Sequence, residues 1–257
     1  MMDDLYVIGG MCMNILVDSR QMKDCDNHTI HYFGIPSLVL MERAALGVTE
    51  EIEKNVQTES KVLLVCGIGN NGGDGLAVAR MLWQKGHQVT AVMIGDWKKV
   101  SEETKRQMEI CQAYQIGIQR EIPKESFDVV VDALFGIGLS RALEGKYFEA
   151  VEQMNCINAY KVAVDIPSGI HADTGAVMGT AFRADITVTF AFPKLGLRLY
   201  PGAEYAGEVV VKEIGIGKEK ILEEKTVCYE AEPKDLMKIP KRKDCLLYTS
   251  DAADDKA

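Results

Sequence analysis

The sequence predicts an α/β fold in which helices cover both faces of a mostly parallel sheet. Val-rich apolar runs alternate along the chain with stretches of helical periodicity, which is typical of strands joined by crossover helices. The runs are continuously apolar, as expected for strands that are buried on both faces. The chain has 257 residues, 47% of them hydrophobic and 26% charged, so it is long enough for one large domain of this class.

Two helices are predicted ahead of the first strand. Asp18 or Ser19 can cap a helix that is closed by Gly34. Pro36 then opens a longer helical pattern that continues to Asn55. Both helices therefore precede the alternating part of the chain.

The alternating part contains the candidate strands and the helices between them. The apolar runs are residues 61–66, 88–95, 127–136, 160–167, 185–192 and 207–215. The helical stretches in the first three intervals are residues 75–86, 101–114 and 143–154. In a doubly wound sheet the ligand binds beyond the carboxyl ends of the strands, where the strand order reverses. Motifs at the strand ends therefore indicate the functional site.

The domain boundaries are predicted from where the periodicity begins and ends. Residues 1–14 are expected to be an extension outside the core, with Met13 as an alternative start. The domain itself is expected to cover residues 15–232. Residues 233–257 have no period, so we expect a linker followed by a disordered tail that is artefactual after about Cys245.

Composition excludes several classes of function. The formal net charge is −9, whereas a nucleic-acid surface needs clustered Lys and Arg, so we expect no nucleic-acid partner. The N-terminal segment is acidic and its apolar stretch contains glycines, unlike a signal peptide, and no membrane partner is expected. The 7 cysteines have no C-x-x-C spacing, which indicates reduced thiols in a cytoplasmic protein rather than a zinc ribbon or a disulfide framework.

A glycine-rich turn is predicted directly after the strand at residues 61–66. Gly67, Gly69 and Gly72 match the G-x-G-x-x-G pattern, in which glycines let the backbone approach a phosphate at a helix N-terminus. Asp74 would repel a pyrophosphate there unless a cation intervenes. An ordinary redox Rossmann domain and a purely structural turn remain alternatives, whereas a Walker loop is excluded because no Gly-Lys-Ser/Thr follows.

Two further strands end in carboxylates. Asp132 is followed by Gly136 and Gly138, and Asp165 is followed by Ser168. Because the carboxyl ends of parallel strands meet at one edge, these oxygens and the glycine turn can converge on one cleft and hold a monovalent or divalent cation. The alternative is that each Asp caps the following turn.

Two other constellations carry weaker signals. Asp165, Ser168 and His171 lie too close in sequence for a hydrolase triad, and Ser168 is not in a G-x-S-x-G elbow. Lys194 and Arg198 follow the fifth strand, where a cation would either meet a ligand phosphate or be a solvated loop charge. Their role stays open at this stage.

Four motifs together resemble the NAD(P)H-hydrate epimerase family over about residues 15–232. They are GIGNNGGDGLAVAR from residue 67, VDALFGIGLSR from residue 131, VDIPSGIHADTG from residue 164 and TFAFPKLGL from residue 189. The resemblance implies a Rossmann-like three-layer α/β/α sandwich. It also implies interconversion of the R and S forms of hydrated NADH and NADPH, a repair step for damaged nicotinamide cofactors.

The resemblance also implies roles for individual residues. Asn71, Asp132 and Ser168 correspond to ligands of a potassium ion. Asp165 contacts the hydrated nucleotide, and our hypothesis is that it moves the proton, as acid for the departing hydroxide and as base for incoming water. The substrate-binding residues implied are Asn70, Asn71, Gly72, Gly73, Asp74, Gly136, Ile137, Gly138, Leu139, Ser140, Arg141, Ala142 and Asp165.

Partners are implied in the same way. We expect a homodimer, formed through the two N-terminal helices. We also expect a fused ADP- or ATP-dependent dehydratase domain that was lost by truncation, because CLLYTSDAADD resembles translated adapter sequence. A non-catalytic nucleotide-binding or scaffold module with the same fold is the main alternative. An ordinary NAD(P)-dependent oxidoreductase is disfavoured by the acid in the glycine motif.

Overall fold

The computed structural model describes residues 6–8, 11–223 and 227–231. The chain divides into two compact units, Leu16–Val227 and a smaller one that combines Met1–Ile15 with Cys228–Ala257. In the smaller unit, strands β1 (Tyr6–Ile8), β2 (Met11–Leu16) and β10 (Cys228–Ala231) form a three-stranded sheet in the order β1-β2-β10. The tail predicted over residues 233–257 lies outside the described residues.

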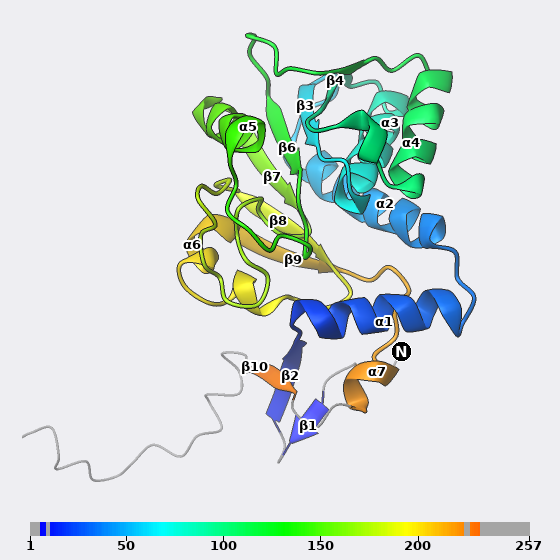
Figure 1. The fold of residues 1–257 in the computed structure, drawn as a ribbon, viewed down its shortest axis with the longest axis vertical. Helices are drawn as coiled ribbons and strands as arrows, with labels where there is room; N and C mark the ends of the chain where they lie inside the picture. The colour runs from blue at the N-terminus through cyan, green and yellow to red at the C-terminus, as the bar shows by residue number, and fades with distance from the viewer. Residues whose placement is uncertain (1–5, 9–10, 224–226, 232–257) are drawn as a thin grey trace, which may run out of the picture. The chain divides into compact units, whose positions relative to one another are not determined.

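The larger unit is built on a seven-stranded sheet, as Figure 1 shows. Its strand order is β5-β4-β3-β6-β7-β8-β9, and every neighbouring pair is parallel. The strands are β3 (Lys61–Cys66), β4 (Gln88–Met93), β5 (Ile118–Gln119), β6 (Val129–Ala133), β7 (Tyr160–Val164), β8 (Ile186–Phe190) and β9 (Glu208–Lys212). The predicted parallel α/β fold is confirmed, although the short strand β5 was not predicted.

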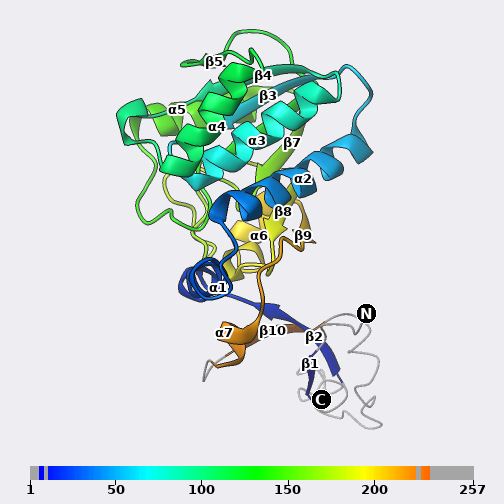
Figure 2. The ribbon, with the colours of Figure 1, turned by 90° about the vertical axis from the view of Figure 1, so that its right-hand side faces the viewer.

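The strand order reverses between β3 and β6. From β3 the chain adds β4 and β5 on one side, and from β6 it adds strands β7 to β9 on the other. Helices therefore cover opposite faces, as Figure 2 shows. On one face lie α2 (Ser37–Asn55), α3 (Asn70–Gln84) and α4 (Glu102–Ala113), and on the other lies α5 (Gly145–Cys156). The crevice beyond the ends of β3 and β6 is the expected ligand position.

The core consists of two apolar layers between the sheet and its helices. Leu63 and Val65 of β3 pack with Val151 and Met154 of α5 in one buried cluster. Short elements that were not predicted complete the unit: the 3₁₀ helices η1 (Trp97–Lys99) and η2 (Leu195–Leu197), α6 (Gly202–Ala206) and α7 (Glu219–Leu222). Among the described helices, none is long and apolar enough to cross a membrane.

Helix α1 (Ser19–His31) begins where the sequence predicted. Asp18 accepts a hydrogen bond from the Gln21 amide at 2.6 Å, and the Gln21 side chain accepts one from the Asp18 amide at 3.0 Å, a capping box. Just ahead of it, Val17 forms a parallel bridge with Lys194, in the segment that follows β8. The start of α1 is thereby attached to the carboxyl end of the sheet, and Figure 1 shows α1 running across this end.

The predicted glycine-rich turn is confined to residues 67–69, because from Asn70 onward the segment forms the first turns of α3. A Cβ on Gly72 would overlap the carbonyl oxygen of Gly67, and one on Gly75 would lie 2.8 Å from Sγ of Cys66. The glycines thus let α3 pack directly against the ends of β3 and β6. This packing outweighs the low helix propensity of glycine, which is about 1 kcal/mol per residue.

Candidate active site

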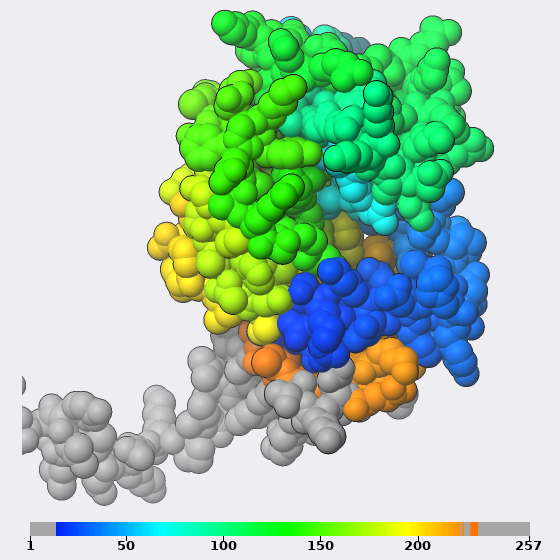
Figure 3. Space-filling view, in the orientation of Figure 1, coloured from blue at the N-terminus to red at the C-terminus, as the bar shows by residue number. Residues whose placement is uncertain are grey.

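A cavity of about 700 Å³ lies at the carboxyl end of the sheet, at the reversal of strand order. Its walls come from α1, α2, the start of α3, the segment after β6, and the ends of β7 and β8. In Figure 3 it is the hollow bordered by α1 in dark blue, the start of α3 in cyan and the segment after β6 in green. The predicted site residues among its lining are Asn70, Asn71, Asp74, Gly136, Ile137, Gly138 and Asp165.

Asp165 sits directly after β7 in a strained backbone conformation. Its φ is +68°, in the left-handed region that residues other than glycine rarely adopt and that typically costs ~1–3 kcal/mol. Its amide donates to the carbonyl of Val188 at 2.8 Å, which holds this turn against β8. A Cβ on Gly136 would lie 2.8 Å from Asp165 Oδ2, so the segment after β6 approaches the carboxylate closely because residue 136 is glycine.

Lys194 is the buried partner of Asp165. Its side chain is 1% exposed, and Nζ lies 2.7 Å from Asp165 Oδ1 and 3.0 Å from both Thr189 Oγ1 and the Phe190 carbonyl. Thr189 Oγ1 is also 3.1 Å from Asp165 Oδ1. The sequence left open whether Lys194 meets a ligand phosphate or is a solvated loop charge. The second alternative is wrong, because the ammonium group is buried and pairs with Asp165.

A second left-handed residue makes this pairing geometrically feasible. Ala191 has φ +58°, and the Phe192 amide donates to the carbonyl of Phe190 at 2.6 Å, so the chain turns sharply at the end of β8. The turn allows the Lys194 side chain to reach Asp165. Strain at both strand ends is the kind that structures retain where geometry serves a site.

Asp132 and Ser168 do not line the cavity and form a second buried polar group. Asp132, in β6, accepts hydrogen bonds from the Ser168 amide and hydroxyl, both at 2.7 Å, and from the Leu134 amide at 3.1 Å. Ser168 Oγ in turn accepts from the Phe135 amide at 3.0 Å. Burial raises the pKa of Asp132 to about 6, in spite of the hydrogen bonds from Ser168.

Asn71 completes the predicted metal-ligand set. Its Oδ1 lies 3.2 Å from the position that a Cβ on Gly136 would take. Gly136 directly follows Phe135, whose amide donates a hydrogen bond to Ser168 Oγ. Its Nδ2 is buried and has no hydrogen-bond partner among the described residues, and a carboxamide can present either its oxygen or its nitrogen to such a position.

These oxygens fit a cation of low charge. The set consists of one carboxylate, one carboxamide and one hydroxyl, which are hard donors. The described part of the chain contains no group of three or more His, Cys, Asp or Glu side chains placed to hold a metal ion. The donors present therefore suit an alkali or alkaline-earth ion rather than a zinc-type site.

Six of the implied substrate-binding residues do not line the cavity. Gly72 and Gly73 are buried inside the packing of α3. Leu139 packs into the core cluster with α5. Ser140, Arg141 and Ala142 are exposed, because the chain turns away from the cavity after Gly138 toward α5. The sequence motif therefore extends beyond the part of the segment that reaches the site.

Five of the lining residues that were not predicted come from α1. Met22, Lys23, Asp26, Asn27 and Ile30 all line the cavity. Their spacing of three and four residues places them on one face of the helix, a signal that was available in the sequence. The pattern alone, however, does not show whether that face of the helix lines a cavity or packs against the core.

Two acids in the cavity hold their protons more tightly than usual. Burial, together with the neighbouring Asp165 carboxylate, raises the pKa of Asp26 to about 6, against the opposing effect of Lys194. Burial also raises the pKa of Asp74 well above its ordinary value, with smaller contributions from Asp165 and Asp26. The cavity therefore combines one ion-paired carboxylate with two acids that resist ionisation.

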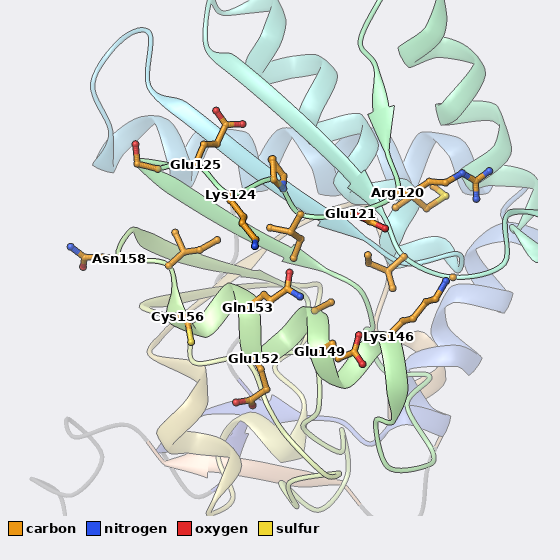
Figure 4. Close-up of a pocket in the computed structure, with 18 of the residues that line it drawn as sticks. Arg120, Glu121, Lys124, Glu125, Lys146, Glu149, Glu152, Gln153, Cys156 and Asn158 are labelled. Atoms are coloured by element: carbon orange, nitrogen blue, oxygen red, sulfur yellow. The ribbon is translucent and has the colours of Figure 1, made fainter.

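A larger cavity of about 1260 Å³ lies elsewhere on the unit, between the end of β4, residues 120–126 and α5 (Figure 4). It contains none of the residues that the sequence singled out. Arg120 stacks over the ring of Trp97 at 4.1 Å, and the labelled Lys and Glu side chains come from the loop and from α5. The smaller cavity is the candidate active site, because it lies where the strand order reverses and where the motifs converge.

Comparison with known proteins identifies the family. Residues 37–196 match the family described as "YjeF-related protein N-terminus". The chain belongs to this family. The resemblance inferred from the four motifs is thereby confirmed, and the matched segment contains Asn71, Asp132, Asp165 and Lys194.

Relatives of the YjeF-related family extend the similarity over most of the chain. The protein "NAD(P)H-hydrate epimerase" of Limosilactobacillus fermentum is 46% identical over 199 residues, covering 77% of this chain and 95% of its own. Its counterpart in Limosilactobacillus reuteri is 48% identical over 198 residues, covering 76% and 93%. The crystal structure of yeast ynu0 has a TM-score of 0.64 at 21% identity, covering 71% of this chain and 83% of that one, and shows the same fold.

Proposed function

We propose that this chain is an NAD(P)H-hydrate epimerase, an isomerase that interconverts the R and S forms of hydrated NADH and NADPH. Relatives with this name are 46% and 48% identical over nearly their whole length. The observation that carries the proposal is the cavity in which Asp165, paired with Lys194, shares the lining with Asn70, Asn71 and Asp74 of α3.

The chemistry that this site would perform is modest. The hydrated nicotinamide carries a hydroxyl group on a carbon beside the ring nitrogen, so the nitrogen lone pair can expel it and form a planar iminium ion. Water can then add to either face of the ring. Asp165 is held by Lys194 and Thr189, with Oδ2 turned toward Gly136, and this carboxylate can exchange a proton with the hydroxyl group and stabilise the cationic ring.

The start of α3 supplies a site for the phosphates of the dinucleotide. Asn70 and Asn71 line the cavity at the N-terminus of this helix, where free amides and the helix dipole favour an anion. Asp74 stands nearby, and its raised pKa favours the neutral form, which weakens the repulsion that a carboxylate would exert on a phosphate. The conflict between the acid and the phosphate is thus reduced by burial.

A potassium ion is proposed as the cofactor, held by Asn71, Asp132 and Ser168. Its positive charge would offset the buried carboxylate below the nucleotide. The fit rests on the oxygen donors and on the buried Asn71 carboxamide described above.

A homodimer and a cytoplasmic location complete the proposal. Exposed apolar side chains lie at the end of α1 and along α2, namely Tyr32, Phe33, Val39 and Leu46, and a second copy could cover them. Cys25, Cys66, Cys111, Cys156 and Cys228 are free thiols, as expected in a reducing compartment. Sedimentation equilibrium of the wild type and of a Phe33→Ser variant tests the dimer, which the variant should weaken.

A chiral assay of the two hydrate epimers, with and without potassium, tests the function. The wild type should bring either pure epimer to equilibrium, and Asp165→Asn should lower the rate by ~10²–10⁴-fold. Asn suits this test because it tolerates the left-handed conformation of residue 165. Binding of the hydrate without turnover would support the scaffold alternative, and turnover of intact NADH would support an oxidoreductase.

A further inference from the structure

Helix α1 contributes a carboxyl group that the mechanism above does not use. Asp26 lines the cavity from α1, whereas Asp165 lines it from the end of β7. Figure 1 shows α1 crossing the end of the sheet, so the two carboxyl groups come from different elements that border the cavity. Among the described residues, no hydrogen bond or ion pair engages the Asp26 carboxyl group, although Asp132 and Asp165 are both engaged.

Epimerisation involves both faces of the ring, so a single carboxylate that serves both steps, as in the hypothesis based on the sequence, would have to reach both faces. The hydroxyl group must leave from one face of the ring, and the new one must form on the other face. Proton transfer requires contact at hydrogen-bond distance, ~2.6–3.2 Å between heavy atoms, so a group on one wall serves one face. An acid–base group on each side of the ring would let the configuration invert while the ring stays in place.

We propose that Asp26 is the second acid–base residue of this site, acting on the ring face opposite to the one that Asp165 serves. The inference rests on the proposed function. In one direction, protonated Asp26 donates its proton as the C–O bond breaks, the hydroxyl group leaves as water with that bonding pair, and the nitrogen lone pair forms the C=N bond.

Addition of water on the other face completes the exchange. A water oxygen forms the new C–O bond, its proton passes to the Asp165 carboxylate, and the C=N π electrons return to nitrogen. One water is released and one is consumed, and one proton has moved from Asp26 to Asp165. The reverse reaction uses the same two groups with exchanged roles.

The surroundings of the two acids suit these roles. Lys194 lies 2.7 Å from Asp165 Oδ1 and holds this carboxylate in place. The other charged groups that share the cavity with Asp26 are Lys23 and Asp74. Burial raises the pKa of Asp26 to about 6, near the range in which an acid–base catalyst can both give and take a proton.

Asp74 is the competing candidate, and its position argues against it. It lies in the first turns of α3, a helix that packs on the sheet next to the ends of β3 and β6. It therefore approaches the cavity from the sheet side, as Asp165 does, rather than from the wall formed by α1.

Oxygen exchange in ¹⁸O-labelled water separates loss of the hydroxyl group from inversion. In Asp26→Asn we expect epimerisation to fall ~10²–10⁴-fold, while one epimer still exchanges its hydroxyl oxygen with retained configuration. In Asp165→Asn the other epimer should show this exchange. Asp24→Asn is the matched control, because it makes the same change on the same helix at an exposed position, and it should behave as the wild type.

Three outcomes would overturn the proposal. They are wild-type epimerisation by Asp26→Asn, exchange of the same epimer in both variants, and the expected Asp26 pattern in Asp74→Asn instead. A urea midpoint for Asp26→Asn no lower than that of Asp24→Asn shows that the fold is intact. If the wild type itself fails to epimerise the hydrates, it is the proposed function that fails, so the two failures are distinguishable.

Discussion

The most informative residues of this protein are a buried ion pair. Lys194 and Asp165 lie 2.7 Å apart, with side chains 1% and 11% exposed. Such a pair gains little net stability from its mutual attraction, because both charges had to be removed from water, yet breaking it leaves one charge buried alone. The pair therefore matters more for the geometry of the site than for the stability of the fold.

Lys194→Met should lower the free energy of unfolding by about 3–5 kcal/mol, because it leaves the Asp165 carboxylate buried without its partner. The double variant Lys194→Met with Asp165→Asn should recover part of this loss. Urea unfolding measures both effects. Lys54→Met is the control, since its side chain is 63% exposed and the same change there should have little effect. Equal losses in the two single variants would contradict the argument.

The raised pKa of Asp26 gives the stability of the protein a definite pH dependence. The ordinary value is 3.8 and the folded value is about 6, so the folded protein binds more protons than the unfolded chain between these values. The free energy of unfolding should therefore decrease by about 3 kcal/mol as the pH rises from about 4 to 6. Asp26→Asn should remove this component of the pH dependence.

Unfolding curves at several pH values compare Asp26→Asn with Asp24→Asn. The Asp24 variant should keep the decrease seen in the wild type, because that side chain is half-exposed. Parallel pH profiles for the two variants would show that Asp26 does not ionise with a raised pKa in the folded protein.

At the scale of elements, the contact between α3 and the sheet determines the shape of the site. The glycines of α3 bring its N-terminus against the ends of β3 and β6, so that Asn71 and Asp74 reach the cavity. Any side chain at Gly72 would push the helix away from the Gly67 carbonyl group. Glycine is thus required here for close approach and not for a turn.

Gly72→Ala should lower the free energy of unfolding by about 3 kcal/mol or more, the upper end of what overpacking costs, because the added methyl group meets backbone atoms that cannot yield. Gly117→Ala provides the control, since nothing lies within 4 Å of the position its Cβ would take. Chemical denaturation compares the two. Equal stability of both variants would show that α3 can shift without loss.

At the scale of the whole molecule, the proposed cation links the site to stability. An ion that binds only the folded state stabilises it by an amount that reaches ~2.7 kcal/mol at a hundred times its dissociation constant. Asn71, Asp132 and Ser168 come from three separate segments, so a cation held by them would tie these segments together.

The thermal midpoint should therefore rise with potassium chloride and not with the same concentration of tetramethylammonium chloride. Asn71→Ala should lose this increment while keeping its stability without potassium, because the Asn71 Nδ2 has no partner among the described residues whose bond would be lost. Differential scanning calorimetry measures both. An equal rise with the two salts would reflect ionic strength alone and count against the site.

Several features of the molecule could be read from local patterns. The continuous Val-rich runs predicted buried parallel strands, Asp18 was a correct N-cap, and the strand ends at Asp132 and Asp165 were located correctly. The four motifs also identified the family. These succeed because strand burial, capping and motif spacing depend on residues only a few positions apart.

Other features were decided by tertiary structure alone. From Asn70 the glycine motif is helical because α3 packs on β3 and β6, Lys194 is buried because Asp165 lies on the neighbouring strand end, and Asp26 reaches the cavity because α1 crosses the sheet. Amino-acid order therefore specified the strands, the caps and the family of this protein. Which charges meet in its cavity depended on the order of the strands, because the contacts of a buried charge are made with residues far away along the chain.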